Sequence, residues 1–186
     1  MLKKILIGVA VVVIAFLAYV GYVMMTTKNH SPADVAQYSG SDLTITVNYC
    51  QPSKKGRVIF GTEAEGALQP FGVKWRTGAN EATEIEFTTE VMISGEVLEK
   101  GKYSLYTIPG KNSWTIAFNS NLGYWGAGMS DPFDESKDVL RVVVPVMNTM
   151  DVTEMFTISF EEIMNNNAIM ILKWDKTQIN VPISKL

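Results

Sequence analysis

The segment with the richest potential chemistry is residues 75–83, which read WRTGANEAT. Arg76 offers a planar fork of donors that suits a carboxylate or a phosphate, and Asn80 and Glu81 add acceptors in a glycine-containing loop. Trp75 could supply an apolar wall, so the cluster could hold a small anionic or sugar-like ligand. The alternative is structural: Arg76 pairs with Glu81 or another carboxylate and fixes the loop.

Two further groups of residues could contribute to a ligand site. Lys55 and Arg57 lie on either side of a glycine and, with Lys54, could attract an anion or lipid head groups; a solvated loop is the alternative. Tyr124 and Trp125 lie in a glycine-rich stretch, where their rings could stack on a carbohydrate. The alternative for this pair is an aromatic loop at the end of a sandwich.

The sequence argues against the common catalytic and metal constellations. There is one histidine, His30, and no G-x-S-x-G string, which leaves no basis for a Ser-His-Asp site. A single cysteine, Cys50, excludes an internal disulfide and a multi-cysteine zinc site. The acidic residues between 131 and 138 lack the spacing of an EF-hand and are expected to form a solvated loop. We therefore predict no catalytic residue, no metal and no cofactor, and lean against an enzyme.

An apolar segment precedes all of these residues. Residues 5–25 carry no charged side chain and, as a helix, are long enough to cross a hydrocarbon core of about 30 Å. Lys3 and Lys4 come before it, so the positive-inside bias places residues 1–4 in the cytoplasm. We predict an uncleaved signal anchor in a bacterial inner membrane with the following domain in the periplasm. A cleaved signal peptide is the competing interpretation.

The composition of the remaining chain limits its partners. Two of the 16 basic residues precede the apolar run and all 19 acidic residues follow it, so the exported part carries 14 − 19 = −5. This charge argues against a nucleic-acid partner, because phosphate neutralisation needs clustered Lys and Arg. The 186 − 25 = 161 residues that follow are enough for a sizeable core without disulfides or a metal.

The exported part shows the period of β-strands. Residues 26–40 are polar and are interpreted as a juxtamembrane stalk, which leaves 41–186 as the domain. Apolar and polar residues then alternate in short segments, namely 43–49, 84–88, 103–108 and 114–118. We predict an all-β fold: an antiparallel β-sandwich of about nine or ten strands after one N-terminal transmembrane α-helix.

The sequence of the C-terminal third predicts how its strands are connected. Residues 139–146 are nearly all apolar, and Pro145 should mark the edge or end of that strand because proline cannot donate to a ladder. Three further strands are expected over 156–163, 168–174 and 177–183, joined by short turns as a β-meander.

Several ordered strings carry a family resemblance. They are WRTGANEAT at 75–83, GKYSLYTIPG at 101–110 and DVLRV at 138–142, with shorter pieces between them. Over about residues 31–183 the chain resembles the uncharacterised bacterial family numbered 2911 among the domains of unknown function. The resemblance implies a compact, mainly β, exported domain and supplies no reaction. Cys50 and Gln51 stand where it implies a small residue and an arginine, so a site built on that arginine would be altered here.

These observations lead to three functional hypotheses. The first is a membrane-anchored periplasmic binding or interaction module, an accessory subunit with an envelope protein as its partner. The second is an enzyme or small-ligand receptor centred on residues 75–83, which requires a concave, solvent-accessible pocket into which these side chains converge. The third is a purely structural envelope protein.

Overall fold

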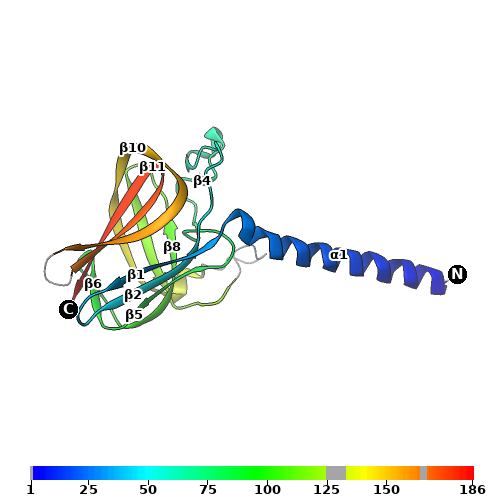
Figure 1. The fold of residues 1–186 in the computed structure, drawn as a ribbon, viewed down its shortest axis with the longest axis horizontal. Helices are drawn as coiled ribbons and strands as arrows, with labels where there is room; N and C mark the ends of the chain where they lie inside the picture. Colours follow the sequence, from blue (N-terminus) through cyan, green and yellow to red (C-terminus); the bar gives the residue numbers. More distant parts are fainter. Residues whose placement is uncertain (1, 125–132, 164–166) are drawn as a thin grey trace.

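A computed structural model of the protein describes residues 2–124, 133–163 and 167–186. Helix α1 (Leu2–His30) projects from a body built of strands (Figure 1). It ends where Ser31 precedes Pro32, because a residue before proline disfavours the helical conformation. The helix is apolar and long enough to cross a membrane, and its most apolar window is not buried against the body.

Nine strands of the described residues form one sheet in the order β1-β2-β5-β8-β9-β10-β11-β6-β7, with antiparallel neighbours. They are β1 (Ala33–Ser39), β2 (Thr44–Cys50), β5 (Thr83–Phe87), β6 (Val91–Ile93), β7 (Glu96–Leu98), β8 (Gly101–Ile108), β9 (Ser113–Asn119), β10 (Asp138–Ile163) and β11 (Asn167–Lys185). Two short strands, β3 (Phe60–Gly61) and β4 (Gln69–Pro70), pair separately, and the 3₁₀ turns are η1 (Glu63–Glu65) and η2 (Glu135–Lys137). The predicted fold class, an antiparallel all-β domain after one apolar helix, is confirmed.

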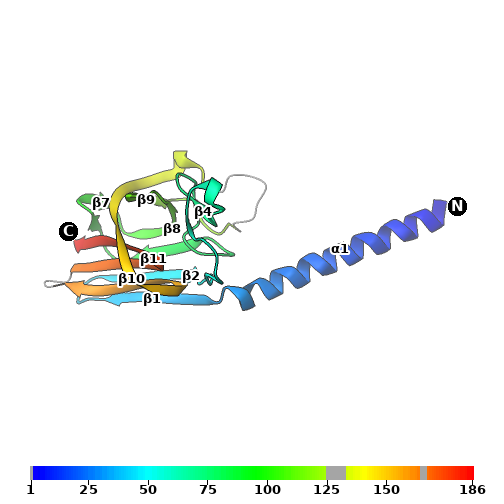
Figure 2. The ribbon, with the colours of Figure 1, turned by 90° about the horizontal axis from the view of Figure 1, so that it is seen from above.

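The sheet becomes two layers because β10 runs through both of them. Its first part pairs with β9 as far as Pro145, and from Val146 onward it pairs with β11. Figure 2 shows β10 curving from the layer that contains β9 and β8 to the layer that contains β11. The layers enclose a single large core, with Ile116 of β9 and Val181 of β11 fully buried within it.

The segment expected to be a stalk is ordered structure. Of residues 26–40, the first five complete α1, and Ala33–Ser39 form edge strand β1 on β2. Ala36 and Tyr38 are buried in alternation, and Tyr38 packs against Phe160 of β10. With only two buried side chains, the period of this strand is too short to recognise in the sequence.

The expected C-terminal meander is a hairpin of two long strands. Asp175, assigned to a turn, continues β11 with a left-handed φ of 53° and pairs with Thr153 of β10. The register shifts on both sides of Thr153, so this is an irregularity in the ladder rather than a chain reversal. Pro145 ends the pairing with β9 as expected, although the strand itself continues.

An aromatic cluster lies between the layers at the end nearest the 75–83 loop. Trp75 stacks on Trp174 of β11 at a centroid distance of 5.6 Å and meets Phe156 of β10 at 4.9 Å. The ring of Trp114 of β9 lies 5.9 Å from that of Trp75. Phe60 of β3 packs against the Trp114 ring at a centroid distance of 4.7 Å. These contacts fix the backbone on both sides of Trp75.

Candidate functional site

A pocket of about 390 Å³ lies between the end of α1, the 52–57 loop and residues 74–80. Its basic lining residues are His30, Lys55, Arg57, Lys74 and Arg76. No carboxylate lines it among the residues that the structure describes. We call it the cationic pocket.

Lys55 and Arg57 bring charges that no ion pair neutralises in the part of the chain that the structure describes. Both side chains are exposed, and neither forms an ion pair within the described residues. Arg57 is oriented by donating from Nε to the Lys54 carbonyl at 3.0 Å and from its terminal nitrogen to the Ser53 carbonyl. Lys54, in contrast, pairs with Asp175 at 2.6 Å, so it does not join them.

Lys74 and Arg76 reach the pocket because Trp75 is held by the sheet. The backbone of Trp75 exchanges two hydrogen bonds with Thr107 of β8, at 2.7 and 2.8 Å. Side chains alternate along such extended backbone, so the residues on either side of the buried indole point away from the core. Sequence reasoning missed Lys74, and this alternation with Arg76 is the signal that could have found it.

The loop after Trp75 is fixed by its own polar contacts. Arg76 is half-buried and donates to the Asn80 carbonyl at 3.0 Å; burial lowers the pKa of its guanidinium. Thr77 adopts a left-handed φ of 54°, and Thr83 donates to its carbonyl at 2.9 Å. Asn80 donates from Nδ2 to the Ser31 carbonyl at 3.2 Å. The loop is thereby attached to the end of α1.

Glu81 lies in a neighbouring pocket of about 360 Å³ rather than in the cationic pocket. It pairs with Lys28 of α1 at 2.7 Å, and the Cys50 thiol lies 3.6 Å from its other oxygen. Burial acts to raise the pKa of Glu81, but the hydrogen bond from Lys28 holds that pKa below its usual range. Burial raises the pKa of the Cys50 thiol. Glu81 therefore joins the helix to the domain.

Of the two aromatic residues predicted to stack on a sugar, Tyr124 and Trp125, the structure describes only Tyr124. Tyr124 lines the pocket that contains Glu81, and its ring meets Phe133 edge-on at 5.5 Å. Trp125 lies outside the described residues. Of the predicted site residues, the cationic pocket thus gathers Lys55, Arg57, Trp75, Arg76 and Asn80.

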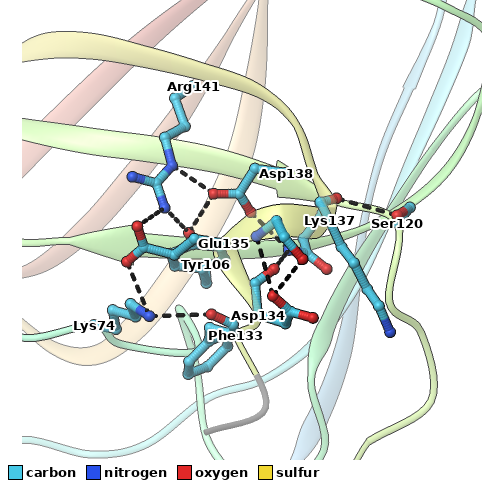
Figure 3. Close-up of polar contacts among 11 residues, drawn as sticks. Lys74, Tyr106, Ser120, Phe133, Asp134, Glu135, Lys137, Asp138 and Arg141 are labelled. Carbon is cyan, nitrogen blue, oxygen red and sulfur yellow. Dashed lines mark hydrogen bonds and ion pairs between the residues drawn. The ribbon is translucent and has the colours of Figure 1, made fainter.

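A polar network behind the pocket holds Lys74 in place (Figure 3). Lys74 pairs with Glu135 of η2 and donates to the Phe133 carbonyl, both at 3.0 Å. The other oxygen of Glu135 pairs with Arg141 of β10 at 3.0 Å. The network is thus anchored on β10 through Arg141.

The network continues into the sheet through Tyr106 of β8. Its hydroxyl accepts from Arg141 at 2.6 Å and donates to Asp138 at 2.7 Å, and Asn119 of β9 donates to the second oxygen of Asp138 at 2.6 Å. Burial, reinforced by the bond to Asp138, raises the pKa of Tyr106, which stays protonated. The acidic residues expected to be solvated therefore include two that pair with basic groups. No group of three metal-ligating side chains occurs in the described part of the chain.

We predict that Glu135→Gln weakens the protein only while Glu135 is ionised. Lys74 and then Arg141 hold the pKa of Glu135 below its usual 4.5. A group with a lowered folded pKa stabilises above its unfolded pKa and loses that contribution as pH falls through the folded value. Wild type should therefore unfold at higher denaturant than E135Q at neutral pH, and the two should converge well below pH 4.5. An undiminished difference in strong acid would contradict the ion pairing; the exposed Glu96→Gln is the control.

Comparison with known proteins identifies the family. The family described as "Protein of unknown function (DUF2911)" matches residues 31–183, most of the chain. The chain belongs to this family. The DUF2911 match begins directly after α1 and includes Lys55, Arg57, Lys74 and Arg76, so the cationic pocket lies almost wholly within it. No curated protein and no solved structure matches the chain significantly. The resemblance found from the sequence strings is confirmed, and the site geometry must supply the function.

Proposed function

We propose that this DUF2911 protein is a membrane-anchored, exported module that binds a small anionic ligand in the cationic pocket. The observation that carries the proposal is the convergence of basic side chains from three separate segments on one concave site without a lining carboxylate among the described residues. The pocket gathers Arg76 and Asn80 with Lys55 and Arg57, but not Glu81, which supports the receptor hypothesis in part. We favour that hypothesis over a protein partner in the envelope, which stays a prediction.

The chemistry of the lining suits phosphate or carboxylate groups. Arg57 and Arg76 present planar donors that match such oxygens, and Lys55 adds a mobile ammonium. The Trp75 and Trp174 rings form an apolar boundary on the side of the core.

The anchoring part of the proposal rests on α1. Its length and hydropathy suit one membrane crossing, and Lys3 and Lys4 favour a cytoplasmic N-terminus with the β domain in the periplasm. The helix is also joined to the domain by the Lys28–Glu81 ion pair and by the Asn80–Ser31 hydrogen bond. An attached helix would therefore hold the pocket at a defined position beside the membrane.

Removing the two charges of Lys55 and Arg57 should abolish anion binding. We expect inorganic phosphate to raise the unfolding midpoint of the full-length chain in detergent, since a ligand at a hundred times its Kd stabilises by about 2.7 kcal/mol. Lys55→Gln with Arg57→Gln (K55Q/R57Q) should remove most of that rise, because both side chains are exposed pocket residues without a carboxylate partner in the described part.

The matched control removes two positive charges that lie outside the pocket. Lys100→Gln with Lys176→Gln (K100Q/K176Q) alters exposed lysines that do not line the pocket, and it should respond to phosphate as wild type does. The proposal fails if phosphate, sulfate and small carboxylates all leave the wild-type midpoint unchanged. It also fails if both double variants lose the response equally.

A further inference from the structure

We infer that the anion bound in the cationic pocket is the phosphate of a phospholipid with a net negative headgroup, in the same bilayer that α1 enters; this inference rests on the proposed function. The first argument is depth. The apolar run ends at residue 25, and at 1.5 Å per residue the helix carries His30 about 7.5 Å farther. The headgroup region on each side of the hydrocarbon core is roughly 5–8 Å thick. His30 and Ser31, which line the pocket, therefore lie at the level of lipid phosphates.

The second argument is the direction in which the site faces. The β3–β4 unit, whose Leu68 and Gln69 line the pocket, lies on the side of the body from which α1 leaves, in both ribbon views (Figures 1 and 2). The Asn80–Ser31 hydrogen bond joins the pocket wall to the helix end. The site is therefore beside the membrane entry point of the chain.

The third argument is an apolar rim next to the charges. Val58 and Leu68 are 48% and 36% exposed, although each is a large aliphatic residue. The two are adjacent in space, because the Leu68 amide donates to the Val58 carbonyl at 2.9 Å, and Leu68 lines the pocket. Exposed aliphatic groups beside basic residues are the composition of surfaces that lie in the interfacial region of a bilayer.

The fourth argument is the local character of the charge. The exported part carries −5, so the domain as a whole is repelled by an anionic membrane surface. Lys55 and Arg57 instead form a local positive site whose side chains make no ion pair in the described residues, although the Lys55 backbone N–H donates to the Glu154 carboxylate at 2.8 Å. A local site in an acidic domain is suited to one headgroup phosphate rather than to diffuse adsorption on anionic lipid.

The test measures bound lipid directly. Full-length protein is reconstituted in nanodiscs of phosphatidylcholine with or without phosphatidylglycerol, released gently into detergent and weighed by native mass spectrometry. Wild type should retain phosphatidylglycerol in preference to phosphatidylcholine. K55Q/R57Q should retain it at least about tenfold less, because charged hydrogen bonds to the phosphate are lost. K100Q/K176Q should match wild type, which controls for annular lipid on α1.

The outcomes separate this inference from the proposed function. If inorganic phosphate stabilises wild type but phosphatidylglycerol is not selected, the lipid assignment is overturned and anion binding stands. If neither probe binds, both fall. Equal retention of phosphatidylglycerol by wild type and K55Q/R57Q also overturns the inference. Should K55Q/R57Q fail to fold, Lys55→Gln alone gives the same comparison, because no described residue bonds to its ammonium.

Discussion

Trp75→Ala should lower the free energy of unfolding by about 3–5 kcal/mol, the range observed when a large buried aromatic is removed. The Trp75 side chain is 3% exposed and contacts four other rings, those of Phe60, Trp114, Phe156 and Trp174. Its indole N–H also donates to the Gly78 carbonyl at 3.0 Å. Replacement by alanine leaves a cavity and removes the hydrogen bond that holds the start of the loop.

Denaturant unfolding of the full-length chain, followed by far-UV circular dichroism, measures this change without depending on tryptophan emission. Trp75→Phe keeps a ring but loses the N–H donor, so it should cost less than Trp75→Ala. Val73→Ala, at a neighbouring exposed position, should remain within about 0.5 kcal/mol of wild type. If Trp75→Ala left stability unchanged while abolishing phosphate binding, Trp75 would be a ligand wall rather than a core residue.

Asp138→Ala should cost about 1–3 kcal/mol, because it leaves the buried Tyr106 hydroxyl without its acceptor. The Asp138 side chain is 7% exposed and accepts from Tyr106, Asn119 and Arg141. Without it, the Tyr106 hydroxyl loses its acceptor, and Nδ2 of Asn119 loses Asp138 but keeps its bond to the Asp134 carbonyl. Arg141 still pairs with Glu135, which limits the loss.

The same unfolding measurement applies, with Asp151→Ala as the control. Asp151 is exposed on β10, so its replacement should stay within about 0.5 kcal/mol of wild type. Asp138→Asn keeps an acceptor for Tyr106 and should be intermediate. Equal, small effects of D138A and D151A would show that the network behind Lys74 contributes little to stability.

The residues of the cationic pocket were only partly predictable. Arg76 stands out by its type in a glycine-containing loop, and Lys55 and Arg57 by their adjacency. The sequence does not reveal that these two segments meet, because their approach depends on contacts such as Lys54 with Asp175 and Ser53 with Met155. Distant pairing of this kind leaves no periodic signal.

Neighbours in the sequence can also belong to different sites. Asn80 faces the cationic pocket and Glu81 faces the adjacent one, where it pairs with Lys28 from α1. Residues 75–83 were interpreted as one ligand cluster. Arg76 and Asn80 do line one pocket together, but Glu81 lines a different one. Successive side chains in an ordered loop point in different directions, and only the backbone conformation, such as the left-handed φ of 61° at Asn80, decides which.

The amino-acid order by itself determined the apolar helix and the antiparallel β character, because both depend on the spacing of apolar residues along a short window. Tertiary structure decided that β1 belongs to the sheet, that β10 joins two layers, and which basic groups are neutralised. Lys54 and Lys55 are adjacent and chemically identical, yet among the described residues only the ammonium of Lys54 pairs with a carboxylate, while Lys55 meets Glu154 through its backbone N–H. That difference arises because electrostatic pairing depends on distance in space, which the folded layers set and the local pattern does not contain.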